Sequence, residues 1–144
     1  MATSNAAPNY LESRLLPYLF KNNSLSFSSP GDSIYVGLCT AVSAAETGSV
    51  TEASFSGYAR QQVAAASWTT IGADSTDTQT AKNTSAIEFP AKTDSGNVTI
   101  THVIIADASS SGNILFVGAL DASKTLAQND IFRINATNLS IELK

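Results

Sequence analysis

The stretch NVTITHVIIAD, residues 97–107, decides the fold. Its side chains alternate with a period of two, which is the period of a β-strand. We expect Val98, Ile100 and Ile104 on one face, and Thr99, Thr101, Val103 and Ile105 on the other. Because β-branched Val, Ile and Thr fill most of these positions, the segment is predicted to be the longest strand of the chain.

Alternation of the same kind on both sides of this segment predicts further short strands at 33–42, 57–64, 67–71, 85–89, 114–120, 131–135 and 138–144. Residues 114–120 are apolar on both faces, as expected of a central strand. Residues 138–144 alternate apolar with polar side chains, so one face of this last strand should be exposed to water.

The segments between these strands are typical of turns and loops. Residues 94–97 and 110–113 each contain a Gly that allows a positive φ, and we expect tight hairpin turns there. The Ser/Thr-rich segments 43–56 and 72–84 are predicted to be long surface loops. Seven or eight short strands joined in this way predict a mainly β fold, a single antiparallel β-sandwich or jelly-roll-like domain.

One segment near the N-terminus has a helical period instead. Its leucines recur at spacings of three and four, at Leu11, Leu15, Leu16 and Leu19. Asn9 and Glu12 are spaced as a capping box, whereas Pro17 should shorten, kink or break the helix near Leu16.

The helix has two possible roles. We favour a short amphipathic helix laid on the sheet, and the alternative is an arm that docks on a neighbouring subunit. The predicted organisation is an N-terminal arm with a short helix at 1–32, followed by the β-sandwich domain at 33–144.

The composition excludes several classes of function. Only 14% of the 144 residues are charged, whereas Ser (20) and Thr (15) are abundant. A net charge of −4 argues against nucleic-acid binding through a basic patch. The longest nearly apolar run, 103–106, is far too short to cross a membrane, and residues 1–9 do not resemble a signal peptide.

The residues that usually carry chemistry are few and scattered. His102 is the single histidine, so we expect a structural side chain with a hydrogen-bond partner at a sheet face, with Asp107 too distant to serve. Cys39 is the single cysteine and lacks a nearby Lys, Arg or Cys, which indicates a buried, inert thiol and excludes a disulfide.

The acidic residues do not form a recognisable site either. A weak Ca²⁺ site is conceivable, but its candidate carboxylates are scattered: Asp74, Asp77, Asp94, Asp107, Asp121 and Asp130. Glu88 and Glu142 would have to converge across a cleft to hydrolyse a glycoside. Tyr58 and Arg60 share a predicted strand face, where they either bind a partner or pack on the sheet. We predict no catalytic, cofactor-binding or metal-ligating residue.

Several landmarks, taken in order, resemble a family of small bacteriophage virion proteins that are often labelled tail fibre proteins. These landmarks are residues 10–12 (YLE), 34–38 (IYVGL), 57–61 (GYARQ), 89–90 (FP), 101–103 (THV), 112–116 (GNILF), 118–120 (GAL), 124–125 (KT) and 139–141 (LSI). Their order and spacing, over nearly the whole chain, carry the resemblance. It implies a non-enzymatic structural protein of the virion, without catalytic residues. A β-sandwich of this size also resembles phage head decoration, or cement, proteins.

Two positions in the particle follow from this resemblance. We favour a capsid decoration protein that binds the major capsid protein at capsomer junctions on the outside of the head. The alternative is a tail, baseplate or tail-fibre component, whose loops 43–56 and 72–84 would face the host; Phe55 is their only aromatic residue. Either protein would be assembled in the host cytoplasm and is expected to be a homo-oligomer, dimer or trimer. A soluble binding module outside the virion is a third hypothesis.

Overall fold

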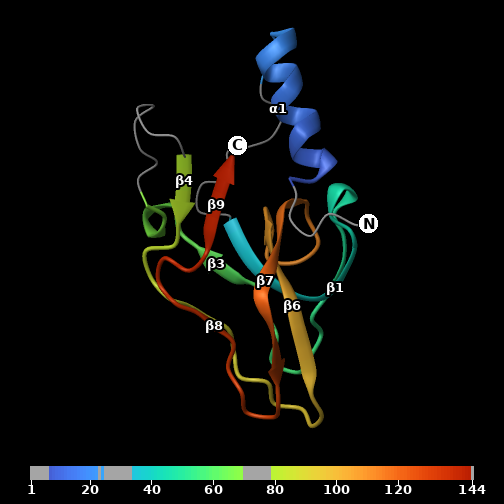
Figure 1. Ribbon diagram of the computed structural model, residues 1–144, viewed down its shortest axis with the longest axis vertical. Helices are drawn as coiled ribbons and strands as arrows, with labels where there is room; N and C mark the ends of the chain where they lie inside the picture. The colour runs from blue at the N-terminus through green and yellow to red at the C-terminus, as the bar shows by residue number, and fades with distance from the viewer. Residues whose placement is uncertain (1–6, 23, 25–33, 70–78, 144) are drawn as a thin grey trace.

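A computed structural model describes residues 7–22, 24, 34–69 and 79–143 of the chain (Figure 1). The elements in these residues are α1 Asn9–Lys21, β1 Ile34–Ala44, η1 Ala45–Thr47, β2 Ser49–Glu52, β3 Gln61–Val63, η2 Ala65–Ser67, β4 Gln79–Lys82, β5 Ile87–Glu88, β6 Val98–Ala106, β7 Ile114–Leu126, β8 Arg133–Ile134 and β9 Ser140–Leu143. The predicted fold class, mainly β with a short N-terminal helix, is confirmed, with nine strands among the described residues instead of seven or eight.

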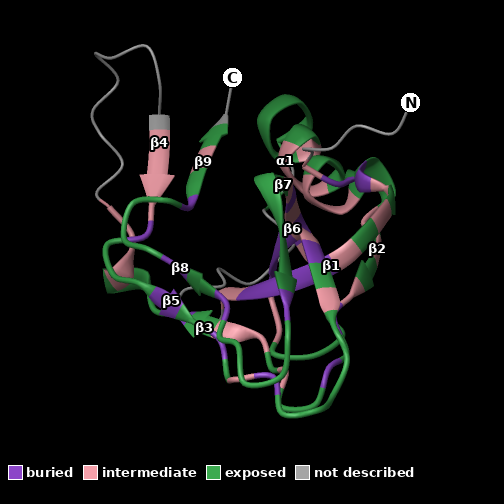
Figure 2. Cartoon of the chain, turned by 60° about the horizontal axis from the view of Figure 1, so that its bottom comes forward, coloured by how far each residue is buried: buried purple, intermediate pink, exposed green. Residues whose placement is uncertain are grey.

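The strands form one large antiparallel sheet and two small ones. The large sheet has five strands in the order β2-β1-β6-β7, with β3 also paired to β1. The pairs β4–β9 and β5–β8 form the two-stranded sheets. The main core lies between these layers and includes Leu38, Phe89, Ile100, Leu126 and Leu139. Figure 2 shows buried residues concentrated along β1, in the middle of the molecule.

The strand predicted at 97–107 is present as β6, and its side chains do not alternate strictly. The prediction that it is the longest strand was wrong, because β6 has 9 residues whereas β1 has 11 and β7 has 13. Its register with β7 pairs Ile100 with Lys124 and then His102 with Ala119, so β7 has extra residues at this point. This bulge lets Ile100 and Val103 both contribute to the main core. Ile104 points to the other face, into a smaller cluster with Cys39, Ala45 and Val117.

The strand predicted at 114–120 is not central. It extends to Leu126 as β7 and lies at an edge of the five-stranded sheet in the described part of the chain. The prediction was wrong because apolar side chains on both faces were taken to mean a strand on each side. Val117 packs in the small cluster with Ile104, Leu120 packs against the main core, and both also line a groove beside β7 that is described below.

Several local predictions also differ from the structure. The loops predicted at 43–56 and 72–84 contain β2 and β4, two short strands of mostly polar or small residues that pairing with β1 and β9 specifies. Residues 72–78 lie outside the described residues. The strand predicted at 57–64 is limited to β3. Of the strand predicted at 67–71, residues 67–69 are described, and they contain a single bridge of Trp68 with Asn83.

The two predicted hairpin turns have different outcomes. Residues 110–113 do connect the paired strands β6 and β7, with Gly112 at φ 68°. Asp107 closes this hairpin, because its carboxylate accepts hydrogen bonds from the backbone (2.7 Å) and side-chain (2.8 Å) N–H groups of Asn113. Residues 94–97 are not a hairpin, because β5 pairs with β8 and the turn carries the chain between sheets.

The helix is longer than predicted. It begins after Pro8, whose carbonyl accepts the first helical hydrogen bond, and it has no side-chain cap, so the capping box of Asn9 and Glu12 was wrong. Pro17 does not break it: the carbonyl of Ser13, which loses its donor, belongs to an exposed residue where water can replace the bond. The helix ends at Asn22 in the left-handed region (φ 52°). The predicted division at 32/33 lies outside the described residues.

Candidate interaction surfaces

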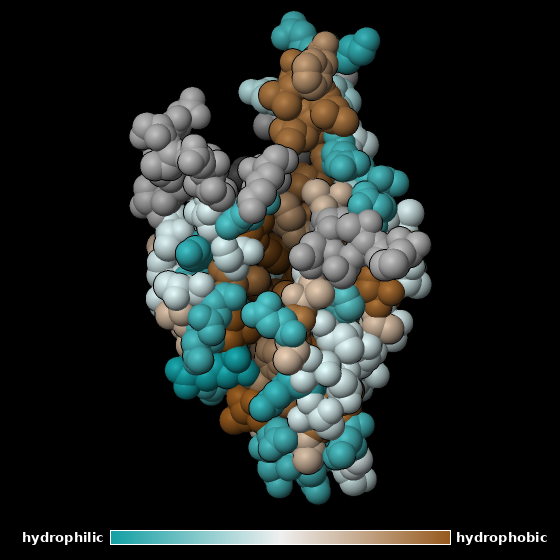
Figure 3. All heavy atoms as spheres, viewed as in Figure 1, coloured by the Kyte–Doolittle hydropathy of each residue, from teal (hydrophilic) through white to brown (hydrophobic). Residues whose placement is uncertain are grey.

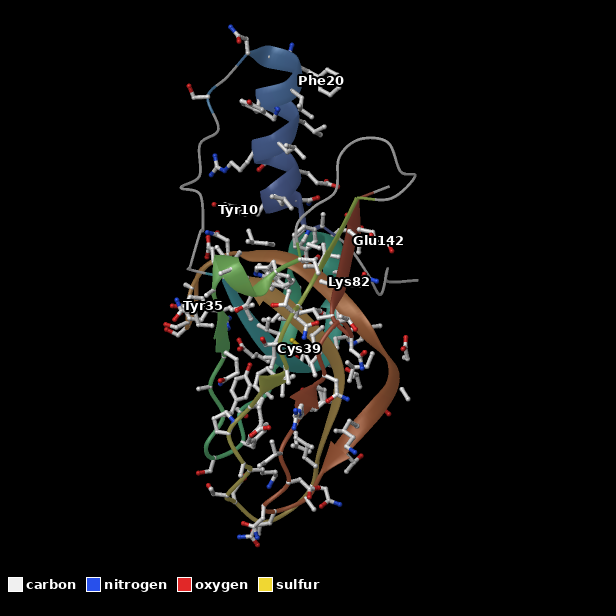
Figure 4. The ribbon with its side chains drawn as sticks, turned by 90° about the vertical axis from the view of Figure 1, so that its left-hand side faces the viewer. Tyr10, Phe20, Tyr35, Cys39, Lys82 and Glu142 are labelled. Atoms are coloured by element: carbon white, nitrogen blue, oxygen red, sulfur yellow. The ribbon has the colours of Figure 1, made fainter. Side chains whose placement is uncertain are left out.

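The exposed apolar side chains gather on α1. Of the five large hydrophobic residues that are exposed in the described part of the chain, four belong to this helix: Leu16, Tyr18, Leu19 and Phe20. Phe20 is 77% exposed and Leu19 58% exposed. Figure 4 shows α1 standing away from the strands, with Tyr10 at the near end and Phe20 at the far end. The expectation of a helix laid on the sheet is therefore wrong.

The apolar face of α1 is unusually wide. At about 100° per residue, the apolar side chains span an arc of about 200°. In order around the helix, this arc contains Tyr18, Leu11, Leu15, Leu19, Leu16 and Phe20, with Glu12 among them in the first turn. A helix that packs on one flat surface needs an apolar stripe about 100° wide. The apolar arc on α1 is about twice as wide as such a stripe.

The second apolar surface is a groove between β7 and β9, with a volume of about 710 Å³. Val103, Ile105 and residues 116–121 line one side, and Ile134 with residues 138–142 lines the other. Ala7, just before α1, lies at this groove. Figure 3 shows apolar side chains in a recess along the middle of the molecule, below the equally apolar helix.

The groove has an acidic rim. Among its lining residues the charged side chains are Asp121 and Glu142, and both are carboxylates. Since β7 is an edge strand and β9 is paired only with β4 in the described residues, the backbone edges of both strands flank the groove. The groove therefore combines apolar side chains with negative charge.

A buried charge network lies where β2 ends beside β1. Arg60, whose side chain is 6% exposed, holds Glu52 through two hydrogen bonds of 2.8 Å each, from Nε and Nη2. Tyr58 donates its hydroxyl hydrogen to Glu52 at 2.6 Å, and its oxygen accepts the N–H of Leu38 at 2.9 Å. Tyr58 and Arg60 therefore bind within the chain, where the sequence had left a partner open.

The network holds four parts of the chain together. Arg60 Nη1 donates to the carbonyls of Ala108 (2.8 Å) and Ser111 (2.9 Å) in the β6–β7 hairpin, while Glu52 ends β2. Gly37 in β1 makes room for it, because a Cβ there would lie 3.0 Å from the Tyr58 hydroxyl oxygen. The arrangement is structural, because every charged group in it is bound by another part of the fold.

These contacts shift the pKa values in consistent directions. Burial alone would raise the pKa of Glu52, but hydrogen bonds from Arg60 and Tyr58 outweigh burial and lower it. Burial and the hydrogen bond to Glu52 raise the pKa of Tyr58 far above its usual range. Burial, followed by the charge of Glu52, raises the pKa of Cys39 to about 12. Cys39 is therefore a buried thiol, although the structure does place Arg60 near it, contrary to the sequence-based expectation.

Lys92 is a buried charge that sequence reasoning missed. Its Nζ donates to the carbonyl oxygens of Asp94 (2.6 Å) and Ser95 (3.3 Å) and to the Asp94 carboxylate (2.9 Å). The hydrogen bond from Lys92 lowers the pKa of Asp94. All three donors of the ammonium group are used, so Lys92 fixes the turn before β6.

The remaining candidate residues are not brought together. The ring Nδ1 of His102 lies 2.8 Å from the Thr101 hydroxyl, and partial burial lowers the pKa of His102. Glu88 pairs with Arg133 at 3.6 Å, and Glu142 belongs to a different small sheet. Asp130 accepts the N–H of Ala127, while Asp74 and Asp77 lie outside the described residues. Within the described ranges, no three His, Cys, Asp or Glu side chains group as metal ligands.

The fold and its surfaces define a class of protein: a small, mainly β domain with a short N-terminal helix and two exposed apolar surfaces. The profile of the family described as Podophage GP4 fiber I protein gp80 matches residues 6–142. The chain belongs to this family. The resemblance to small phage virion proteins labelled tail fibre is confirmed, and the family indicates a structural role in the virion.

The family match covers α1 together with β1 to β8 and most of β9. A comparison with curated proteins found no match. In the part of the chain that the structure describes, no helix has the length and apolar character needed to span a membrane.

Proposed function

We propose that this protein is a non-enzymatic fibre subunit of the bacteriophage virion, located in the tail or baseplate region. The family match over residues 6–142 carries this proposal, because the family is described by a fibre protein. The exposed apolar side chains of α1 support it. Leu19 and Phe20 are unfavourable in water, and a neighbouring subunit that covers them would remove this cost. The partners of such a subunit are tail or baseplate proteins and further copies of the chain.

A capsid decoration protein is the second candidate function. The observation that favours it is the weakly charged surface: with 14% charged residues, little free energy is lost when the Ser- and Thr-rich faces are covered. Repeated weak contacts over a closed shell can stabilise a head without any strong individual interface. The partner would then be the major capsid protein.

Immunogold labelling of purified particles separates the two candidates. Antibodies raised against the isolated protein are applied to intact virions and viewed by negative-stain electron microscopy. The fibre proposal predicts gold at the tail end of the particle. Gold distributed over the whole head would replace it with the decoration function, and absence of the protein from dissociated particles on an immunoblot would overturn both.

A further inference from the structure

We propose that α1 of one copy binds in the groove between β7 and β9 of a second copy. When every helix is bound in this way, the copies form a closed dimer or trimer. This goes beyond the virion function, because it concerns the isolated chain and can be tested without the phage. The two surfaces are the exposed face of α1, with Leu16, Leu19 and Phe20 at its far end, and the groove between β7 and β9.

The shapes of the two surfaces correspond. An apolar arc of about 200° on α1 calls for a partner that encloses the helix, whereas one flat face covers only about 100°. The groove has two walls, one from β6 and β7 and the other from residues 134–142. A helix of 13 residues is also marginal in water on its own, so a partner surface is needed to stabilise it.

The charges of the two surfaces are complementary. The groove contributes the carboxylates of Asp121 and Glu142, and its lining includes no Lys or Arg among the described residues. Lys21 lies in the last turn of α1, next to Phe20, whereas the one carboxylate of the helix, Glu12, lies in the first turn within the apolar arc. A helix tip with a positive side chain therefore meets an acidic rim.

Only the start of α1 lies beside β7 of its own chain, and the far end of the helix projects away from the strands (Figure 4). Pro8, at the start of the helix, is fully buried and fixes the direction in which α1 leaves the strands. Ala7 lies at the groove, and from there the helix leads outward (Figures 1 and 4). At about 1.5 Å per residue, Phe20 lies about 15 Å further along the axis than Tyr10. The far end of α1 is therefore accessible to the groove of another copy.

The buried surface area is large enough for a stable interface only when every copy in the dimer or trimer has its helix bound. Four large exposed side chains of about 100 Å² each give about 400 Å², and the groove contributes a similar area, so one docked helix buries about 800 Å². This is the range of weak crystal contacts. Two reciprocal exchanges, or three in a ring, bury about 1,600 Å² or more, which is the size of a stable interface.

Sedimentation velocity of purified variants tests the proposal. The expected mass of the wild type is two or three times 15.0 kDa at micromolar concentration. Replacing Leu16, Leu19 and Phe20 together by Ser on α1, or Ala119 by Arg at the groove, should each raise the dissociation constant by at least about 100-fold. The matched control is Ile131→Ser, which removes an exposed large hydrophobic residue outside α1 and should leave the mass unchanged.

Cross-linking of two separately prepared variants identifies the contact. Phe20→Cys and Ala119→Cys chains of different tag length are mixed and treated with a short bismaleimide. Since Cys39 is buried and its pKa is raised to about 12, it should not react at neutral pH. A product containing both tags is expected, and it can form only between copies.

Three results would overturn the exchange. The first is a wild type that sediments as a monomer. The second is an Ala119→Arg variant that keeps its mass while the α1 variant loses it, since α1 would then pair with another α1. The third is a cross-linked product that contains only Phe20→Cys chains. Circular dichroism of each variant checks that the strands remain folded, and Ser140→Trp blocks the groove independently if Ala119→Arg unfolds.

Discussion

Glu52, Tyr58 and Arg60 show how a chain with few charges uses them. The Arg60 side chain is buried and those of Glu52 and Tyr58 are half-buried, and together they bind the end of β2, the N–H of Leu38 and the β6–β7 hairpin. Arg60 is bound on the carboxylate in a bidentate geometry, which is the strongest arrangement for such a pair. A buried pair of this kind is costly to break, because either partner alone is left with an uncompensated charge.

Glu52→Gln should therefore lower the free energy of unfolding at neutral pH by about 3 kcal/mol, since Arg60 would lose its carboxylate. Urea unfolding followed by circular dichroism measures this loss. The matched control is Glu88→Gln, because Glu88 and its partner Arg133 are both exposed. An exposed pair contributes about 0–1 kcal/mol, so the control should change little. Equal losses in the two variants would contradict the structural role of the network.

The same network predicts a dependence of stability on pH. The pKa of Glu52 is lowered from its ordinary value of 4.5 in the folded state, so the unfolded chain binds a proton at higher pH than the folded chain. The stabilisation from ionised Glu52 is present above pH 4.5 and is lost as the pH falls through the folded pKa. Urea unfolding at neutral pH and at about pH 3.5 should show a smaller loss on acidification for Glu52→Gln than for the wild type. An equal loss of stability on acidification in both proteins would contradict this role of Glu52.

Part of this cluster could be predicted from the sequence. Tyr58 and Arg60 are two residues apart, and we expected them on one face. Glu52 could not be joined to them, because residues 53–57 bend back through a turn that periodicity does not reveal. The pairing of Cys39 in β1 with Glu52 in β2 could not be predicted either, because β2 lies in a segment that was predicted to be a loop.

At the level of elements, the sequence predicted those strands whose apolar pattern is strong. β1, β6, β7 and β9 were all located, because each carries alternating or continuous apolar residues. β2 and β4 were missed because their few apolar residues give no pattern, and pairing with a long neighbour determines them. The helix was found from its leucines, but its length was underestimated, because Pro17 lies on the side of α1 where losing a hydrogen bond is tolerated.

α1 contributes little to the core, so its removal tests how the chain is organised. A chain that lacks residues 1–22 should keep its strands and melt within about 5 °C of the full chain. The reason is that α1 has no buried residue, and Pro8 is the one buried residue among the described residues that the truncation removes. It should also fail to form the oligomer. Thermal circular dichroism and sedimentation velocity measure the two effects. An insoluble or unfolded truncated chain would mean that the helix belongs to the core.

At the level of the whole molecule, one large sheet and two small ones leave an apolar groove and a protruding helix on the same subunit. The sequence indicated a virion structural protein through landmarks that extend over the chain, and the family match agrees. It did not distinguish head from tail, because that difference depends on surfaces that form only after folding. The groove joins residues 103–121 to residues 134–142, and no spacing in the sequence predicts it.

The number of copies in the particle tests the fibre function most directly. Quantitative mass spectrometry of purified virions gives the ratio of this chain to the major capsid protein. A fibre subunit predicts a few to about a few dozen copies, in a multiple set by the symmetry of the tail. A ratio near one to one, or a simple fraction of it, would contradict the fibre function and indicate a decoration protein on the head.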